Sequence, residues 1–535
     1  MSNYFVFLGP IFEERCQVAK PQEGKERSLL GSSSLVGLMT LLSRVMGLLR
    51  DMVIAHSFGA GASADAFFVA FKIPNFLRRL FAEGAFAQAF VPVLSEYRSQ
   101  GSLMEVKRLV DRVAGSLGLV LSLITAVAIL GAPLLAMAFA PGFYLNDTAK
   151  YLLTVDMLRL TFPYLLLISL TAFSGSILNS YDRFAIPAFT PVLLNLSLIG
   201  SVFWLRPLLD TPVMALAWGV LIAGVAQLLL QLPFLARAHL LPNPKVDFKH
   251  PGVSKIITLM IPALFGVSVS QINLLLDTVL ASMLQTGSVS WLYFSDRLVE
   301  LPLGIFGIAI ATVILPMLSR KHTEKSPEAF AAMLDWAVRM VLLIGIPAAL
   351  ALWLLAGPLL VTLFQYGAMT AGDVTQASYS LRAYSLGLLA FMLIKVLAPG
   401  YYSRQDTRTP VKIGIWAMGV NMLLNLALIV PLAHAGLALA TSLAAFLNAG
   451  LLLRGLLRDR VMRWQPGGRR FGLQLSCANV AMGLLLYFYV PELSQWQAWD
   501  AWERATAMAL SCALGGAVYI VTLGLTGVRL RHLRH

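Results

Sequence analysis

Four arginines lie in or beside apolar stretches of the chain, where a charged side chain is costly: Arg44, Arg50, Arg78 and Arg297. An ionisable residue at the centre of a bilayer costs roughly 2.5–3.5 kcal/mol on insertion scales, so each one needs a physical reason. Arginine suits phosphate because its planar guanidinium stays charged and donates two parallel hydrogen bonds. The four arginines exceed what the nearby carboxylates neutralise, which favours a site for a large anion. The alternative is a set of internal salt bridges that only hold helices together.

A second polar group combines one carboxylate with amide and hydroxyl side chains: Asp277, Asn421, Asn425 and Thr441. Oxygen ligands of this type suit a hard cation, and a single charged ligand favours sodium over calcium. The alternatives are a proton on Asp277, an ion pair between Asp277 and Lys395, or hydrogen bonds that join helices. A sodium ion is thus a candidate ligand, and no cofactor is required.

The composition predicts the kind of element that carries these residues. Hydrophobic residues make up 58% of the 535 positions and charged residues 13%, about half of the ~25% charged residues in an ordinary soluble domain. This excludes a soluble enzyme or a disordered protein, and three dispersed cysteines exclude a disulfide framework. The chain is therefore expected to be an all-α polytopic membrane protein. The net charge is +14, and the charged residues are separated by apolar runs. The lipid bilayer is therefore an expected partner and nucleic acid is not.

Apolar stretches of ~20 residues, enough to cross a bilayer, recur along the chain. They predict fourteen transmembrane helices, centred near residues 42, 77, 122, 165, 195, 222, 267, 304, 348, 388, 421, 443, 480 and 514. Loops after even-numbered helices are rich in Lys and Arg, whereas those after odd-numbered helices carry only Lys150, Arg206 and Arg504. The positive-inside rule then places both termini in the cytoplasm. Residues 1–27 lack the pattern of a secretory signal and are expected to form a poorly ordered cytoplasmic extension.

The chain also resembles itself at an offset of about 224 residues. Pro133-Leu134-Leu135 matches Pro358-Leu359-Leu360, and Pro92-Val93-Leu94-Ser95 matches Pro316-Met317-Leu318-Ser319. Six helices per repeat, an even number, keep both copies in the same orientation. This predicts two parallel six-helix lobes around a central cavity, at residues 28–240 and 241–460, and a C-terminal helix pair at 461–535. Rocking of such lobes exposes the cavity alternately to each side of the membrane.

Several motifs resemble one family. The continuous segment from Ala64 to Phe86 (ADAFFVAFKIPNFLRRLFAEGAF) is long and specific, and it follows Ser43 to Asp51 (SRVMGLLRD). Further motifs are GSVSW at 287–291 and APGYYSRQD at 398–406. Together they are similar to the MurJ (MviN) lipid II flippases of bacterial peptidoglycan synthesis. The resemblance runs from about Leu29 to the C-terminus and implies the fold of the multidrug/oligosaccharidyl-lipid/polysaccharide exporters.

The resemblance also implies a substrate and roles for residues. The substrate would be undecaprenyl-diphosphate-linked disaccharide-pentapeptide (lipid II), moved from the inner to the outer leaflet of the bacterial cytoplasmic membrane. Its diphosphate would meet the four arginines, and four further residues would serve the cavity or its gating: Asp65, Glu83, Ser290 and Glu300. The C-terminal helix pair would hold the lipid tail in a groove. Some family members bind sodium at positions matching the Asp277 group, whereas others rely on membrane potential.

Two rival functions are weaker. An exporter of drugs or of another lipid-linked oligosaccharide shares the fold, but drug substrates are often cationic and would not need inter-lobe arginines. A membrane-embedded enzyme needs an acid/base or metal-binding loop outside the membrane, and the chain has no His/Asp cluster in its longer non-cytoplasmic loops. A transporter, not an enzyme, is therefore expected, with the peptidoglycan synthesis machinery as a candidate partner.

Overall fold

The computed structural model describes residues 23–80, 85–324 and 326–528, and within these ranges it contains helices and no strand. Residues 1–22 of the expected extension and the candidate gating residue Glu83 lie outside the described residues. The first helix begins at Glu23, so residues 23–27, expected to belong to the extension, are helical. The all-helical membrane architecture predicted from composition is confirmed.

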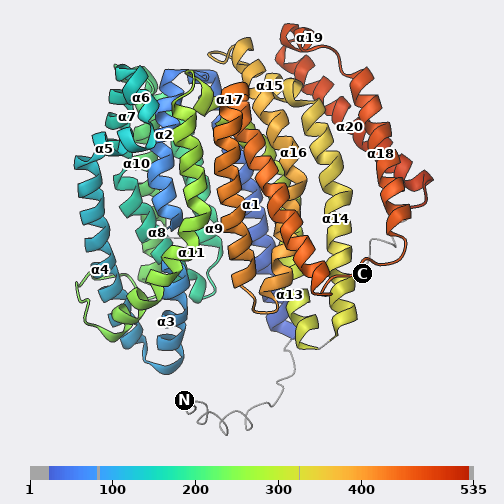
Figure 1. Ribbon diagram of the computed structural model, residues 1–535. Helices are drawn as coiled ribbons and strands as arrows, with labels where there is room; N and C mark the ends of the chain where they lie inside the picture. The colour runs from blue at the N-terminus through green and yellow to red at the C-terminus, as the bar shows by residue number, and fades with distance from the viewer. Residues whose placement is uncertain (1–22, 81–84, 325, 529–535) are drawn as a thin grey trace.

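The first half of the chain forms a bundle at the left of Figure 1, with α1 at the centre of the view. Its helices are α1 (Glu23–Phe58), α2 (Ala62–Arg78), α3 (Phe86–Gln100), α4 (Leu103–Leu130), α5 (Ala132–Phe139), α6 (Pro141–Asn146), α7 (Thr148–Thr161), α8 (Pro163–Ser180), α9 (Ala185–Trp204) and α10 (Met214–Arg237). We call the end of the molecule at which α6 lies, the top of Figure 1, the upper end.

The second half forms a bundle beside the first (Figure 1). Its helices are α11 (Pro251–Ser282), α12 (Ser288–Pro302), a π-helical segment η3 (Leu303–Gly307), α13 (Ile308–Thr323), α14 (Pro327–Leu354), α15 (Ala356–Phe364), α16 (Ala371–Tyr402) and α17 (Arg408–Arg458). Although the sequence groups α11 with this half, α11 packs against α3, α4, α5 and α6 as well as against α12 and α17. It therefore joins the two bundles along their length.

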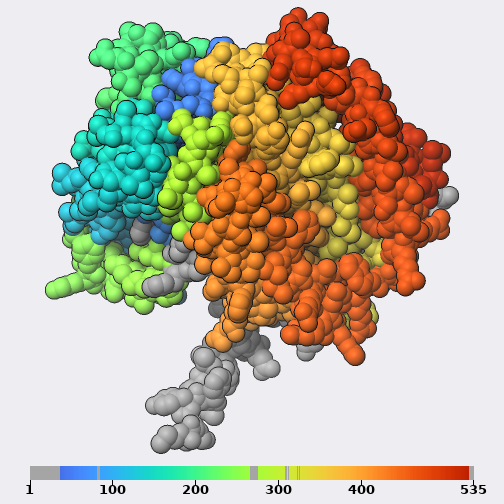
Figure 2. All heavy atoms as spheres, turned by 45° about the horizontal axis from the view of Figure 1, so that its top comes forward, coloured from blue at the N-terminus to red at the C-terminus, as the bar shows by residue number. Residues whose placement is uncertain are grey.

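The remaining helices α18 (Gly468–Tyr489), α19 (Leu493–Ala498) and α20 (Ala501–Leu525) flank the second bundle on its outer side. Figure 2 shows the same arrangement in space-filling form, with the first bundle at the left and these last helices at the right edge. The predicted C-terminal pair corresponds to α18 and α20, and α18 packs against α14.

The internal repeat is visible in the helix boundaries. Helices α5 and α15 begin at residues 132 and 356, which are 224 residues apart, and α7 and α16 begin at 148 and 371, which are 223 apart. In each bundle the short helix leads to a longer one that starts at the upper end: α5 leads to α7 by way of α6, and α15 leads directly to α16 (Figure 1). These two pairs of helices thus begin at the offset that the sequence matches give.

Within the described residues, nine helices are long and apolar enough to cross a membrane. One of them, α17, covers both the eleventh and the twelfth predicted spans, which are separated by a break in helical geometry at Ala433 (φ 48°), just after Pro431. The four predicted spans without a match in this set fall on α1, α2–α3, α11 and α12–α13. These carry most of the intramembrane charges and breaks, so the count of fourteen stays a prediction.

The helical backbone is interrupted between α12 and α13, next to α1. Pro302 ends α12, because proline lacks the N–H of a regular helix, and the π-helical segment η3 with its glycines follows. Such π-helical turns are common at functional sites. Here the break brings Gly304 against Arg44 of α1: a Cβ on Gly304 would lie 1.9 Å from Arg44 Nη1. Glycine permits this close approach without displacing the guanidinium of Arg44.

Candidate functional site

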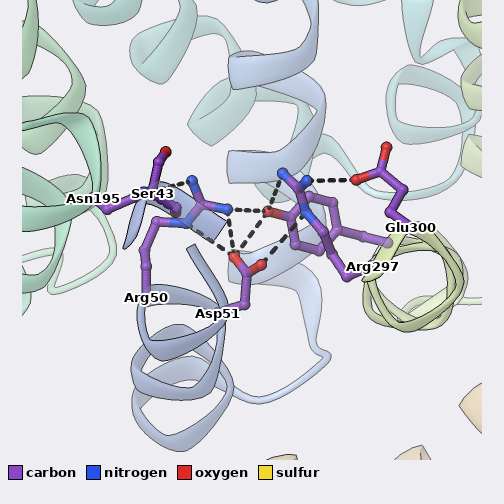
Figure 3. Close-up of polar contacts among 7 residues, drawn as sticks. Ser43, Arg50, Asp51, Asn195, Arg297 and Glu300 are labelled. Atoms are coloured by element: carbon purple, nitrogen blue, oxygen red, sulfur yellow. Dashed lines mark hydrogen bonds and ion pairs between the residues drawn. The ribbon is translucent and has the colours of Figure 1, made fainter. Parts of the chain in front are cut away.

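A hydrogen-bonded ion cluster joins α1 and α9 of the first bundle to α12 of the second (Figure 3). Asp51 Oδ1 accepts from Arg50 Nη2 at 2.6 Å and from Arg50 Nε at 2.9 Å. Arg50 also donates to Asn195 Oδ1 of α9 at 3.0 Å and to the Tyr293 hydroxyl of α12 at 2.9 Å. Arg50 and Asp51 are buried, so a desolvated ion pair is held here by hydrogen bonds from three helices.

Arg297 completes the cluster from the second bundle. Its Nε lies 3.4 Å from Asp51 Oδ2, and its Nη1 donates to Glu300 Oε2 at 2.8 Å. Tyr293, one helical turn earlier, lies between the two arginines, since its hydroxyl accepts from both Arg50 and Arg297 and donates to Asp51 at 2.9 Å. The side chain of Arg297 remains 35% exposed, so its guanidinium is reachable from the space beside the cluster.

That space is a cavity of about 220 Å³ between the bundles. Its walls come from α1, α9 and α12: Ser43, Arg44, Gly47, Leu48, Arg50, Asp51, Pro191, Leu194, Asn195, Arg297, Glu300 and Leu301. Three of the four arginines predicted to bind an anion therefore meet in one cavity, and the predicted neighbour Glu300 lines it too. Arg44 and Arg50 come from one bundle and Arg297 from the other, as the inter-lobe hypothesis requires.

The charges in this cavity do not cancel. Three arginines face two carboxylates, Asp51 and Glu300. Arg44 makes no ion pair with any residue whose side chain the structure describes. A partly buried cation without a counter-ion attracts an anion more strongly than the same cation in bulk water. A forked guanidinium is the preferred partner for phosphate oxygens, so the cavity is chemically suited to a diphosphate.

Arg78 lies apart from the cavity. It occupies the last turn of α2, where its Nε donates to Asn75 Oδ1 at 2.9 Å, and it is not among the residues that line the cavity. The structure therefore unites Arg44, Arg50 and Arg297 but leaves the role of Arg78 as a prediction.

The predicted gating pair Asp65 and Ser290 forms a second inter-bundle contact at the upper end. Asp65 Oδ1 accepts from the Ser290 hydroxyl at 2.6 Å and from the Ser290 backbone N–H at 3.0 Å. Its Oδ2 accepts from the backbone N–H of Gly287 at 2.7 Å. A carboxylate at the first turn of α12 also interacts favourably with the helix dipole. We call this contact, Asp65 with Gly287 and Ser290, the latch.

Other close contacts accompany the latch. The backbone N–H of Ala368 donates to the carbonyl of His56 at 2.9 Å, and that of Gly142 donates to Ser282 Oγ at 3.2 Å. A Cβ on Gly59 would lie 2.5 Å from the Ala368 carbonyl, so the backbones meet directly. The bundles are therefore closed against each other at the upper end.

The candidate cation site is partly assembled. Asn425 Nδ2 donates to Asp277 Oδ1 at 2.8 Å, which brings α17 against α11. Asn421 lies one turn earlier on α17 and is buried. Thr441 donates to the carbonyl of Leu437 in its own helix at 3.0 Å. No described contact joins Thr441 to Asp277.

Sequence reasoning missed several members of these sites. Lys72 of α2 interacts electrostatically with both Asp277 and Asp296, whereas the sequence suggested Lys395 as the basic rival. Tyr293 and Asn195 were also missed. The spacing of Tyr293 four residues before Arg297, on the same helical face, is a pattern that could have identified it. Asn195 has no such pattern, because a single amide in an apolar helix is common.

Comparison with known proteins agrees with this geometry. The family model described as "Lipid II flippase MurJ" matches residues 54–504. The chain is 51% identical to a Vibrio cholerae protein named "Probable lipid II flippase MurJ", over 95% of this chain and 98% of that protein. It is 42% identical to the "Lipid II flippase MurJ" of Burkholderia cenocepacia, over 92% and 97% of the two chains.

Solved structures agree as well. A structure described as "Lipid II flippase MurJ, inward closed conformation" matches with a TM-score of 0.78 at 26% identity, covering 92% of this chain and 98% of that one. An inward-facing multidrug resistance MATE transporter of the MOP superfamily matches with a TM-score of 0.62 at 14% identity, covering 80% and 97%, which shows a shared fold. With the family model over most of its length and relatives of this identity, the chain belongs to the MurJ lipid II flippase family.

Proposed function

We propose that this protein translocates lipid II, the undecaprenyl-diphosphate-linked peptidoglycan precursor, from the inner to the outer leaflet of the bacterial cytoplasmic membrane. The observation that carries the proposal is the cavity between the bundles, in which Arg44, Arg50 and Arg297 outnumber Asp51 and Glu300. A diphosphate brings the negative charge that this cavity lacks. Family membership supplies the chemical class of the lipid.

The proposed mechanism is alternating access. With the latch closed at the upper end, the diphosphate enters the cavity from the opposite side and pairs with Arg44 and Arg297. Because these arginines belong to different bundles, a bound anion draws α1 and α12 together. It shifts the equilibrium between the states closed and open at the upper end by as much as its affinities for the two states differ. Opening of the latch then releases the substrate at the upper end. Arg78 is proposed as a further diphosphate contact along this path and Glu83 as a gating residue.

The test of this function is depletion of the protein in its host, followed by an assay of the leaflet that holds lipid II. The expected result is accumulation in the inner leaflet, reversed by the wild-type chain. Retention of normal outer-leaflet lipid II during full depletion would contradict the proposal.

We further propose that the upper end faces the outside of the cell, so that both termini are cytoplasmic. The support is the positive-inside distribution of loop cations. The test places single cysteines at two exposed positions, Ala371 at the upper end and Thr407 at the opposite end, after Cys16, Cys477 and Cys512 are replaced by serine. An impermeant thiol reagent added to whole cells should label A371C and spare T407C. Reversed labelling would overturn the orientation.

The lobes at 28–240 and 241–460 and the groove of the 461–535 helix pair for the lipid tail are part of the same proposal. The groove is supported by large apolar side chains exposed on α18 and α20, among them Leu473, Phe488 and Ile520. The peptidoglycan synthesis machinery is proposed as the partner that supplies and consumes the lipid. Co-purification after crosslinking in cells tests that association. If no peptidoglycan synthesis enzyme co-purifies, the association is rejected.

A sodium ion is proposed to bind beside Asp277, with Asn421, Asn425 and Thr441 supplying neutral oxygens. The contact between Asp277 and Asn425 supports the site, and the nearby ammonium of Lys72 opposes it, because one cation beside the carboxylate reduces its affinity for another. Thermal unfolding in sodium chloride and in potassium chloride distinguishes a sodium ion at Asp277 from an ion pair between Asp277 and Lys72. Stabilisation by sodium that disappears in Asp277→Asn is expected; equal stability of the wild type in both salts would assign Asp277 to Lys72.

A further inference from the structure

Lys150 is one of the three cations on the side of the membrane that the sequence leaves almost free of positive charge. Located in the first turn of α7, it is buried, with its side chain 4% exposed. Its Nζ donates to Thr286 Oγ1 at 2.9 Å, lies 3.5 Å from Asp65 Oδ2 and stands 4.4 Å from the centre of the Phe143 ring. The ammonium therefore sits directly behind the latch.

The partners of Lys150 divide between the two bundles. Asp65 and Phe143 belong to the first bundle with Lys150 itself, since α2 packs against α7. Thr286 belongs to the turn between α11 and α12 of the second bundle. Likewise, the latch donors Gly287 and Ser290 belong to the second bundle. When the bundles separate, Asp65 loses those donors but keeps Lys150.

A polar hollow of about 310 Å³ adjoins Lys150 at the junction of the bundles. It is lined on one side by the end of α6 and the start of α7 (Asn146, Asp147 and Lys150) and on the other by the end of α11 and the turn that follows it (Ser282, Gln285 and Thr286). The bundles are thus incompletely packed beside the ion pair, and separation there admits water to Asp65 and Lys150. In the closed state both side chains are nearly inaccessible.

We propose that Lys150 is a positioning residue for transport, which neutralises Asp65 so that the upper end can close over it. The proposal rests on the alternating-access function proposed above. Closure buries the Asp65 carboxylate, and a buried charge without a counter-ion is strongly unfavourable, whereas the same charge is tolerated when opening hydrates it. Removal of the ammonium therefore destabilises the closed state more than the open one.

This role predicts a specific pattern among variants. Lys150→Met leaves the carboxylate uncompensated and opens the upper end. Asp65→Asn leaves the ammonium uncompensated and acts in the same direction. The double variant buries neither charge, so it closes more readily than either single variant. Lys150→Arg keeps the charge and behaves as the wild type.

The experiment measures the closed and open populations directly. Spin labels are attached to cysteines at Leu145 on α6 and Ala371 on α16, two exposed positions at the upper end of opposite bundles, in the full-length protein without its native cysteines. Pulsed electron resonance gives the distance distribution. The expected result is a rise of at least roughly tenfold in the ratio of long to short distances for Lys150→Met, with recovery in the double variant and in Lys150→Arg.

An unchanged distribution in Lys150→Met would overturn the proposal, as would additive opening in the double variant, because a merely structural lysine is not rescued by loss of Asp65. If Lys150→Met fails to fold, Lys150→Gln, which still can donate to Thr286, takes its place with the same expectation. The distance measurement needs no lipid II, so it can support the role of Lys150 even if the protein does not translocate lipid II. Conversely, a negative distance measurement would not contradict lipid II translocation.

Discussion

The latch and the arginine cavity both connect the first bundle to α12, yet they differ in how completely their charges are satisfied. At the latch, Asp65 accepts three hydrogen bonds from Gly287 and Ser290 and has Lys150 as a counter-ion. In the cavity, three arginines face two carboxylates. Asp51 contacts both Arg50 and Arg297, but Arg44 forms no ion pair with the described side chains and Arg297 is partly exposed.

The difference teaches that one helix carries two kinds of inter-bundle contact. The latch is complete without a ligand, so it stabilises closure by itself. The cavity has room and surplus positive charge, so it becomes electrostatically complete only when an anion enters. A transporter needs both: a contact that closes one end and a site whose satisfaction depends on the substrate.

Arg297→Ala should have the largest effect on transport. It removes the one arginine of the second bundle among the described residues that line the cavity, and it takes one partner from Asp51. A hydrogen bond to a charged group is worth about 1.5–3 kcal/mol, which corresponds to roughly 10- to 100-fold in lipid II translocation into the outer leaflet of proteoliposomes. Arg297→Lys should restore little, because an ammonium lacks the forked geometry.

The matched control for that variant is Arg159→Ala, which removes an exposed arginine whose ion pair, within the part of the chain that the structure describes, is with Asp156 of the same helix. It should leave translocation unchanged, since exposed pairs contribute little. Equal translocation by Arg297→Ala and Arg159→Ala would mean that the anion binds outside the cavity.

Arg44→Ala sharpens the comparison because Arg44 is the cavity cation without a described ion-pair partner. Translocation should fall about tenfold, while the thermal unfolding temperature stays within a degree or two of the wild type, since no buried pair is broken. The expected signature is a functional loss without a stability loss. A large drop in unfolding temperature would show that Arg44 supports the fold instead.

Asp65→Asn tests the latch side. The amide retains one acceptor oxygen but loses the charge that strengthens bonds from Gly287 and Ser290, so the closed end should weaken by about 1–3 kcal/mol. A single cysteine at Ala60, buried in the wild type and beside Gly287, should react faster with a thiol reagent in this variant. An unaltered reaction rate would show that the latch does not hold the upper end closed.

Gly304→Ala should have the smallest effect of the four. The added methyl group would lie against the guanidinium of Arg44, which can move aside because it is the far end of a flexible side chain. Translocation should therefore fall less than in Arg44→Ala, by about two- to fivefold. Combining the two substitutions should add nothing further, because the displaced group is then absent. Additive losses would separate Gly304 from Arg44.

The sequence alone identified those site residues whose charge is costly to bury in a membrane. Arg44, Arg50 and Arg297 could be identified because an arginine in an apolar helix demands an explanation, and the repeat placed Arg297 in the other bundle. Asp65 and Ser290 followed from the family resemblance. Their direct contact required the structure, because residues 225 positions apart meet only through packing.

The remaining features could not be read from the sequence for physical reasons. Arg78 has the same composition-based argument as Arg50, but its position at the end of α2 takes it away from the cavity lining. Lys72 and Lys150 lie near carboxylates that are distant in the sequence. Which carboxylate each lysine meets depends on how the helices pack, and the sequence does not show that packing.

The central claim, that the cavity binds the diphosphate of a lipid-linked precursor while the latch does not, is tested most directly by affinity. Binding of lipid II to the purified protein in nanodiscs should be compared for the wild type, Arg44→Ala and Asp65→Asn, with undecaprenol, which lacks the diphosphate, as the control lipid. The account predicts that Arg44→Ala weakens lipid II binding about tenfold without altering undecaprenol binding, and that Asp65→Asn changes lipid II affinity far less. Equal lipid II affinity in Arg44→Ala and the wild type would contradict it.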